Sequence, residues 1–265
     1  MDPVALNARN PGAMTGTGNW TWLIPGRVPT LIDAGVGDQG HLDDLERALG
    51  AAPLAQVLVT HGHADHAAGT VAISERMPSV RFMKLPWPDR DHRWPVKWTP
   101  LHDHDLIEAG DVSLSVVHTP GHAPDHACFW HAASGILFGG DLAIAHTTVW
   151  IPSSLDGDLA QYVASLQRVI ALQPSRILPA HGPVIDDPVS VLRGYITHRR
   201  ERERQILEAL GEGVTTPLAI VARIYPRLSR HLVPRAAETV TAHLVKLERE
   251  LAVRRDGDAW HIIGP

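Results

Sequence analysis

Four residues of types that bind metals lie within six positions, directly after a short apolar run. In VLVTHGHADHAAGT (57–70), His61, His63, Asp65 and His66 follow a run with the composition of a buried strand. Alternate side chains of extended backbone point the same way, so His61 and His63 can hold one ion. Asp65 and His66 open a predicted helix and point elsewhere, which suits a second ion. We therefore favour a metal centre over a polar loop at this position.

The composition leaves histidine and carboxylate side chains as the available metal ligands. Cys128 is the single cysteine, which excludes an intrachain disulfide and a multi-cysteine zinc site, whereas the chain has 17 histidines. A length of 265 residues suits one large domain or a medium domain followed by a small one. No apolar run approaches about 18 residues, and no basic start precedes an apolar segment, so we expect a cytoplasmic enzyme without a membrane partner.

Short β-prone runs and helical stretches alternate over the first two thirds of the chain. Strands are expected at 18–25, 29–35, 55–60, 80–85, 112–118, 127–132, 135–141 and 176–180, and helices at 40–50, 66–77 and 158–172. This order predicts an α/β sandwich of sheets covered by helices. The Pro- and Trp-rich segment 86–100 is expected to be neither strand nor helix, but a surface insertion.

The last quarter of the chain has mainly helical sequence patterns. Helical patterns at 198–210, 216–226 and 235–250 are followed by two β-prone runs around Asp256-Gly257, a common hairpin dipeptide. Three helices followed by a β-hairpin is the order of elements in a winged-helix domain. We therefore predict a catalytic domain at 1–196 and a winged-helix-like domain at 197–265.

Three further motifs extend the pattern that begins at His61. They are HTPGHAPDH (118–126), FGGD (138–141) and LPAHG (178–182). Together with HGHADH (61–66), in this order, they resemble the ligand motifs of the metallo-beta-lactamase superfamily. The resemblance implies an αββα sandwich and a hydrolytic metal centre.

The resemblance also implies a division of the ligands between two metal ions. His61, His63 and His122 would hold one ion, Asp65, His66 and His181 the other, and Asp141 would bridge them. Imidazoles and carboxylates suit two Zn²⁺, and iron or manganese could take their place. Such a pair can activate a shared water as the nucleophile, with Asp141 fixing the ions and Asp65 or a metal-bound water managing the proton.

Several other residues are candidates for supporting roles. Asp33 and His126 are expected to orient ligand imidazoles by hydrogen bonds, and His146 is a candidate for facing the substrate. His102 and His104 are expected to face solvent, and His118 to be structural. The tryptophans Trp87, Trp94 and Trp98 fit two interpretations, a wall of the substrate cleft or a loop pinned by buried aromatic rings.

The C-terminal segment narrows the resemblance to the beta-lactamase-like protein 2 group. An aspartate at 141, where familiar beta-lactamases have a cysteine nearby, argues against that activity. The group implies hydrolysis of an ester, thioester or phosphodiester; it includes an endoribonuclease and, more distantly, thioesterases that act on carrier proteins. Two hypotheses outside this group are an iron-dependent sulfur dioxygenase, which is an oxidoreductase, and a nucleic-acid-binding regulator.

The distribution of charged residues along the chain indicates which binding partner to expect. Residues 197–265 hold 12 Lys and Arg against 9 Asp and Glu, while residues 1–196 hold 12 against 20. The predicted helix at 235–250 carries both signs, whereas a helix that faces nucleic acid is usually basic on one side. We therefore expect this domain to cap the cleft or to form a homodimer contact. The expected partner is a small-molecule or acyl-carrier substrate, with RNA as the other possibility.

Overall fold

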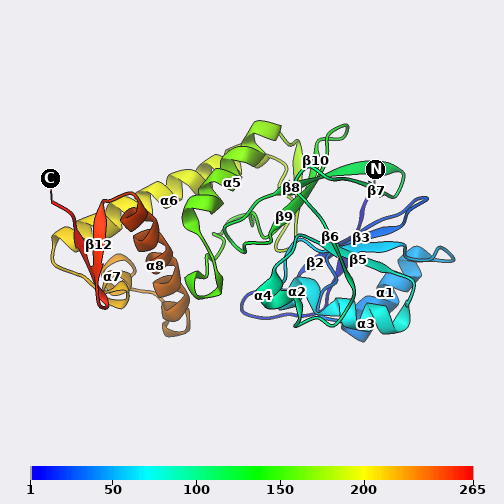
Figure 1. The fold of residues 1–265 in the computed structure, drawn as a ribbon, viewed down its shortest axis with the longest axis horizontal. Helices are drawn as coiled ribbons and strands as arrows, with labels where there is room; N and C mark the ends of the chain where they lie inside the picture. The colour runs from blue at the N-terminus through cyan, green and yellow to red at the C-terminus, as the bar shows by residue number, and fades with distance from the viewer. Residues whose placement is uncertain (1, 265) are drawn as a thin grey trace.

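The computed structural model describes residues 2–264 and consists of two parts side by side. The N-terminal part has two sheets and the helices against them; the C-terminal part has three helices and a hairpin (Figure 1). The α/β fold and the C-terminal winged-helix arrangement are confirmed.

The first sheet has six strands in the order β1-β2-β3-β4-β5-β6. Strands β1, β2 and β3 pair antiparallel, and β3 to β6 pair in parallel. The strands are β1 (Val4–Asn7), β2 (Trp20–Ile24), β3 (Thr30–Ile32), β4 (Gln56–Leu58), β5 (Arg81–Lys84) and β6 (Trp98–Pro100). Their side chains are buried on both faces of the central strands, as expected for a parallel sheet between layers.

The second sheet has five strands in the order β11-β10-β9-β8-β7. Only β10 and β11 pair in parallel. The strands are β7 (Leu106–Ala109), β8 (Val112–His118), β9 (Ala127–His131), β10 (Ile136–Gly140) and β11 (Arg176–Pro179). A core that contains Leu58 of one sheet and Phe129 of the other fills the space between them.

Helices cover the outer faces of both sheets. Below the first sheet lie α1 (Gln39–Leu49), α2 (Ala64–Ala67) and α3 (Gly69–Arg76), and over the second lie α5 (Leu159–Leu172) and the start of α6 (Pro188–Gly211), as Figure 1 shows. The helix starts are explained by local sequence: Asp38, Asp158 and Asp187 each accept a hydrogen bond from a backbone amide of the first turn.

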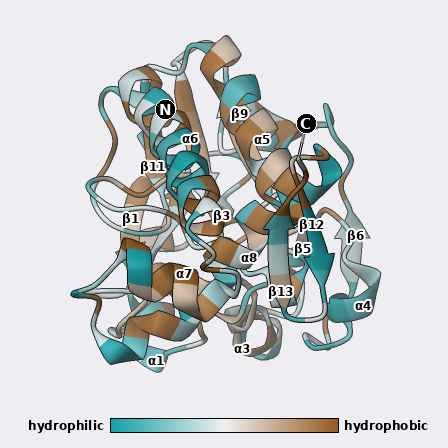
Figure 2. Cartoon of the chain, turned by 90° about the vertical axis from the view of Figure 1, so that its left-hand side faces the viewer, coloured by the Kyte–Doolittle hydropathy of each residue, from teal (hydrophilic) through white to brown (hydrophobic). Residues whose placement is uncertain are grey.

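Helix α6 joins the two parts without interruption, and the predicted boundary at 196/197 lies inside it. Its middle is hydrophilic in Figure 2, which looks onto the C-terminal part. The remaining elements are α7 (Pro217–Ile224), the 3-10 turn η2 (Arg230–Leu232), α8 (Val233–Arg249), β12 (Val253–Asp256) and β13 (Ala259–Ile262). They enclose a separate core that includes Ile206, Leu244 and Trp260.

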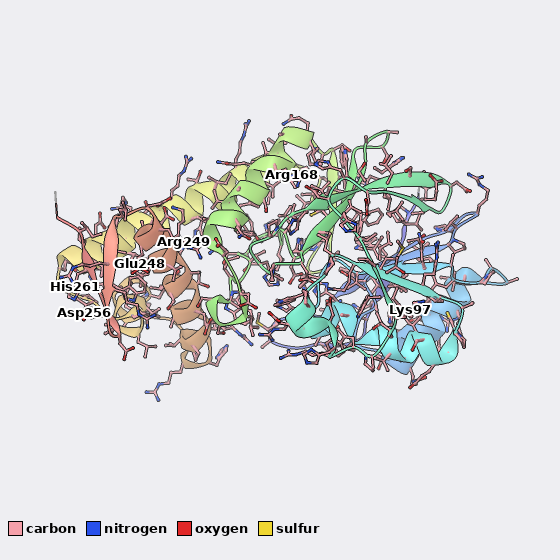
Figure 3. All side chains as sticks on the ribbon, in the orientation of Figure 1. Lys97, Arg168, Glu248, Arg249, Asp256 and His261 are labelled. Carbon is pink, nitrogen blue, oxygen red and sulfur yellow. The ribbon has the colours of Figure 1, made fainter. Side chains whose placement is uncertain are left out.

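Polar contacts fasten the C-terminal part to the catalytic part. Glu238 of α8 accepts hydrogen bonds from the Ser154 amide at 2.9 Å and the Ser153 hydroxyl at 3.1 Å, in the 3-10 turn η1 (Ser153–Leu155). Arg249, at the end of α8, pairs with Asp158 at the start of α5; Figure 3 shows Arg249 on the side of α8 that faces α5.

The prediction that residues 86–100 form neither a strand nor a helix was wrong. Pro88–Asp91 forms the short helix α4, and Trp98–Pro100 is the edge strand β6, paired with β5. Proline is tolerated at the first turn of a helix, where Pro88 lies, and in an edge strand of a sheet, where Pro100 lies. The strands β1 and β7 were not predicted. Among residues 2–264, no helix is long and apolar enough to cross a membrane.

Candidate metal centre

Four chain segments deliver the seven predicted ligands to one place. The turn between β4 and α2 supplies His61 and His63, α2 itself supplies Asp65 and His66, and the turn between β8 and β9 supplies His122. Asp141 directly follows β10, and His181 lies two residues after the end of β11. Residues separated by up to 120 positions therefore meet at one edge of the two packed sheets.

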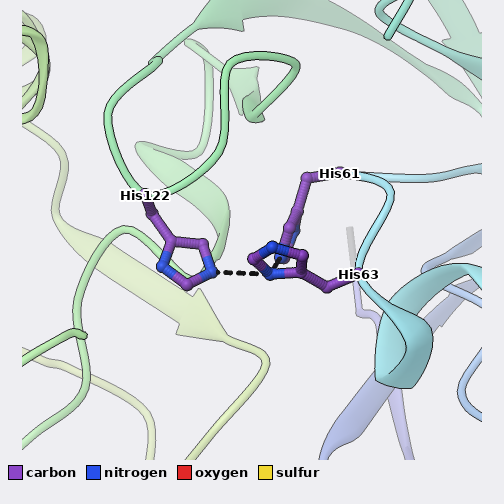
Figure 4. Close-up of side chains that lie close together, drawn as sticks. All are labelled: His61, His63 and His122. Atoms are coloured by element: carbon purple, nitrogen blue, oxygen red, sulfur yellow. Dashed lines mark hydrogen bonds between the residues drawn. The ribbon is translucent and has the colours of Figure 1, made fainter. Parts of the chain in front are cut away.

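Three imidazoles form the first group. Nε2 of His61 and Nε2 of His122 each lie 3.0 Å from Nδ1 of His63, as Figure 4 shows. Nδ1 of His122 is held by the carbonyl oxygen of Trp150 at 2.7 Å, which fixes the ring. One nitrogen from each ring lies within 4.8 Å of the others, close enough for a single ion to contact all three.

Asp141 lies between this group and the second one. Its Oδ2 is 3.3 Å from Nε2 of His122, and its Oδ1 is 3.2 Å from Nε2 of His181 and 3.4 Å from Nε2 of His66. Asp65 completes the second group, with Oδ2 3.2 Å from Nε2 of His181. Asp141 thus has one oxygen toward each group, the arrangement that a bridging carboxylate requires.

The electrostatics favour cations at this position. Burial and the neighbouring imidazoles lower the pKa of His61 well below its usual value and that of His63 to about 3, so both rings are neutral and keep a free lone pair. Burial would also lower the pKa of His181, but Asp141 and Asp65 outweigh it and raise that pKa to about 9. The two carboxylates therefore require positive charge beside them.

The residues present fit a two-metal group. His63 Nε2, His66 Nε2 and Asp141 Oδ1 are buried atoms with no hydrogen-bond partner among the described residues. Buried polar atoms without partners are costly unless something else contacts them. Five imidazoles and two carboxylates are donors that Zn²⁺ or iron accepts.

Asp33 contacts one histidine of the second group. Its Oδ2 accepts a hydrogen bond from Nδ1 of His66 at 2.8 Å, and its Oδ1 accepts one from the Thr60 amide at 2.7 Å. This orients the His66 ring so that Nε2 faces Asp65 and Asp141. Asp33 has a left-handed backbone with φ 61°, an uncommon conformation that its hydrogen bonds hold in place.

His126 acts on the backbone and not on a ligand ring, so that part of its prediction was wrong. Its Nε2 accepts a hydrogen bond from the Asp141 amide at 3.0 Å, and its Nδ1 lies 2.8 Å from the Thr119 hydroxyl. Gly140, just before Asp141, has φ 49°, and a Cβ there would come within 2.8 Å of His126 Nε2. The glycine lets the chain approach His126 closely and so sets the position of Asp141.

The other histidines lie away from the centre. His146 is exposed and does not line the cleft described below. His102 and His104 have exposed side chains, as predicted. His118 Nε2 donates to the carbonyl oxygen of Pro124, a structural contact.

The three tryptophans have different surroundings in the structure. Trp94 lines the cleft and donates from Nε1 to the carbonyl oxygen of Gly62 at 3.2 Å. Trp87 is buried beside His63, and the Trp98 ring packs against Phe82. Trp94 is therefore in a position to contact a substrate, while the other two support the fold.

Sequence reasoning missed a buried ion pair next to the ligand turn. Nζ of Lys84 lies 2.9 Å from Oδ2 of Asp125, and the same oxygen accepts a hydrogen bond from the amide of Gly62 at 2.8 Å. Gly62 lies between two of the ligands. The lysine sits in an apolar strand and the aspartate in the HTPGHAPDH turn, and no local spacing connects them.

A cleft of about 660 Å³ opens onto the ligands. It is lined by Asp65, Asp141, His63, His122 and His181 on the catalytic side, and on the other by residues of α6, of the α7–α8 connection and of α8. The volume is in the range of sites that hold small molecules. The C-terminal part therefore forms a wall of the cleft.

Comparison with known proteins agrees with this geometry. The family model "Metallo-beta-lactamase superfamily" matches residues 14–181, which include all seven predicted ligands. The chain belongs to the metallo-beta-lactamase superfamily. A second model, "Beta-lactamase associated winged helix domain", matches residues 216–260. The superfamily and the accompanying winged-helix domain are those that the sequence motifs predicted.

Curated relatives cover both parts of this metallo-beta-lactamase-fold protein. A beta-lactamase-like protein 2 homolog of Drosophila melanogaster is 34% identical over 261 residues, covering 92% of this chain and 87% of that protein. An atrochrysone carboxyl ACP thioesterase of Aspergillus chevalieri is 29% identical over 279 residues, covering 98% and 87%.

Solved structures share the fold. A beta-lactamase domain protein from Burkholderia ambifaria superposes with a TM-score of 0.85 at 21% identity, over 98% of this chain and 91% of that one. TTHA1623, solved in a di-iron-bound form, superposes with a TM-score of 0.57 at 26% identity, over 72% and 96%.

Proposed function

We propose that this member of the superfamily is a dinuclear zinc hydrolase that cleaves an acyl thioester or ester. The observation that carries the proposal is the clustering of seven candidate ligand side chains, with Asp141 between two groups, five of which line a cleft of small-molecule size. Two zinc ions in such a site supply a nucleophile from water at neutral pH and polarise the bond to be cleaved.

The chain's own residues have separate tasks in this proposal. His61, His63 and His122 would hold one ion and Asp65, His66 and His181 the other, with Asp141 shared. Asp65 is the more exposed of the two carboxylates, 27% against 12% for Asp141, and faces the cleft. Burial opposes its ionisation, but the nearby imidazoles outweigh burial and lower its pKa, so it is ionised and placed to accept a proton.

The apolar part of the cleft supports an acyl substrate. Ile144, Val149 and Trp150 line it beside the ligands, and Leu228 and Leu232 line it from the C-terminal part. A hydrocarbon or aromatic acyl group would lose water on these surfaces. The relative in Aspergillus chevalieri that is named a thioesterase supports a thioester as the bond cleaved.

Metal analysis of the purified protein, combined with hydrolysis assays, tests the proposal. Protein purified without added metal is analysed for zinc, iron and manganese, and hydrolysis of S-hexanoyl-N-acetylcysteamine is followed by thiol release. We expect two zinc ions per chain, loss of activity after chelation and recovery with zinc. Stoichiometric iron with oxygen consumption and no hydrolysis would support a redox enzyme instead.

Phosphodiester hydrolysis is the second candidate, because arginines line the cleft beside the ligands. Bis-p-nitrophenyl phosphate and single-stranded RNA therefore belong in the same panel. Cleavage of either at a rate that exceeds thioester hydrolysis would replace the leading proposal.

A further inference from the structure

We propose that five arginines lining the cleft form a phosphate-binding site, and that the substrate is an acyl thioester whose thiol part carries a phosphate group. This inference rests on the proposed thioester hydrolysis and extends it to the leaving group. The residues that carry it are Arg90, Arg93, Arg199, Arg202 and Arg235, called the arginine wall below.

The arginine wall is assembled from both parts of the protein. Arg90 lies in α4 and Arg93 just after it, Arg199 and Arg202 are one turn apart on α6, and Arg235 lies in the first turn of α8. All five line the same cleft as the metal ligands. Side chains three residues apart on a helix share a face, so Arg199 and Arg202 point into the cleft together.

None of these five arginines has a carboxylate within 4.0 Å among the described residues, whereas nine other arginines of the described chain form such ion pairs. The carboxylates that line the cleft are Asp65 and Asp141, both in the metal centre. The whole chain carries a net charge of −5, so five arginines without a carboxylate partner in one cleft are a local concentration of positive charge.

Two of the arginines have buried donors that are unused. Arg199 is 3% exposed; its Nη2 donates to the Val149 carbonyl oxygen at 2.5 Å, and its Nε has no partner among the described residues. The buried Nε of Arg202 is also without a partner there, while its guanidinium lies 4.2 Å from the centre of the Tyr225 ring. Stacking fixes the plane of that guanidinium and leaves its edge free to donate to an anion.

A phosphate group matches this wall better than a carboxylate does. Phosphate offers three or more acceptor oxygens and up to two charges, and arginine binds it through paired N–H donors. The cleft volume of about 660 Å³ suits a small molecule more than a long polynucleotide. The apolar residues that line the same cleft, such as Ile144 and Leu228, give the acyl and thiol segments a surface to contact.

The arginines could instead serve to hold the fold together, and the experiment must distinguish that role from phosphate binding. Arg199 joins α6 to Val149 and so holds the two parts together. Arg202 donates to Gln205, and Arg235 makes no side-chain hydrogen bond within the described chain, so neither fastens the catalytic domain. Arg202→Gln and Arg235→Gln are therefore the informative variants. Arg200→Gln is the matched control, because Arg200 is exposed on α6 and does not line the cleft.

The test compares two thioesters that differ by one phosphate, S-hexanoyl-4′-phosphopantetheine and S-hexanoyl-pantetheine. We expect Arg202→Gln and Arg235→Gln each to raise KM for the phosphorylated substrate by about 10-fold or more, with kcat little changed, since a hydrogen bond to a charged group is lost. KM for the other thioester should stay the same, as should both values in Arg200→Gln. Equal effects on both thioesters would overturn the inference.

A binding measurement separates this inference from the proposed function. S-methyl-4′-phosphopantetheine and S-methyl-pantetheine, which cannot be hydrolysed, are titrated calorimetrically into the purified protein. We expect binding of the phosphorylated compound alone, weakened by salt and by Arg202→Gln. Such binding without hydrolysis of either thioester would contradict the proposed function and support the phosphate site. Absence of that binding, or cleavage of single-stranded RNA in place of thioesters, would overturn the inference.

Discussion

The ammonium group of Lys84 lies 2.9 Å from Oδ2 of Asp125, and both side chains are almost completely buried. Burial raises the pKa of Asp125 to about 6, although Lys84 and the Gly62 amide oppose the shift. Removal of one partner leaves an uncompensated charge inside the protein. We expect Lys84→Met to lower the free energy of unfolding by about 3 kcal/mol or more.

Urea denaturation measures this effect, and two further variants interpret it. Lys97→Met is the control, because Lys97 is an exposed lysine on the catalytic part (Figure 3). The double variant Lys84→Met, Asp125→Asn should recover part of the lost stability, since Asp91, the other carboxylate beside Lys84, is partly exposed and can be hydrated. A Lys84→Met protein as stable as Lys97→Met would show that the pair has no such role.

Asp33 provides a test of the contact that orients His66. Replacement by Asn keeps the size of the side chain but removes the charge that accepts the Nδ1 proton at 2.8 Å. We expect the affinity for the second metal ion to fall by about 10- to 100-fold, as for other residues that orient ligand imidazoles. Competition with a chromogenic chelator measures it. Unchanged affinity would mean that His66 keeps its orientation without Asp33.

The buried imidazole of His41 gives a prediction about pH. Its Nε2 lies 2.8 Å from the Thr21 hydroxyl, and burial lowers its pKa to about 4. The unfolded chain takes up this proton near the ordinary pKa of about 6.5. Stability is therefore lost as the pH falls from about 6.5 to 4, by up to about 3 kcal/mol from this group.

His41→Gln removes this contribution. In the wild type, His41 takes up a proton on unfolding at pH 5 and pH 6, and in the variant it does not. The drop in the free energy of unfolding from pH 6 to pH 5 should therefore be about 1 kcal/mol smaller in the variant than in the wild type. The other buried histidines are the same in both proteins, so the difference isolates His41. Identical pH dependence in the two proteins would show that His41 is not responsible.

The clustering of the seven candidate ligands could be predicted because these residues lie in motifs that follow strands. HGHADH alone contains four ligands, and the turn at His122 and the strand ends at Asp141 and His181 contain the rest. Trp98–Pro100 could not be predicted as a strand, because prolines around it obscure a pattern that an edge position tolerates.

The arginine wall could not be predicted for a different reason. Arg90, Arg202 and Arg235 come from three helices, and only the docking of α6 and α8 on the catalytic part brings them to one cleft. The acidic residues of α8 made that helix look mixed in charge. In the structure Glu238 contacts Ser154 and Glu250 pairs with Lys246, so neither lines the cleft with Arg235.

The proposed two-metal chemistry depends above all on the bridging position of Asp141, which metal analysis of Asp141→Ala can test. Wild type, Asp141→Ala and the exposed-histidine control His102→Ala are purified identically, and metal per chain and thioester hydrolysis are measured on the same samples. We predict two metal ions and full activity in wild type and control, and in Asp141→Ala fewer than two ions with activity reduced by about 1,000-fold or more. An Asp141→Ala protein that keeps two metal ions and full activity would contradict a bridging role for this carboxylate.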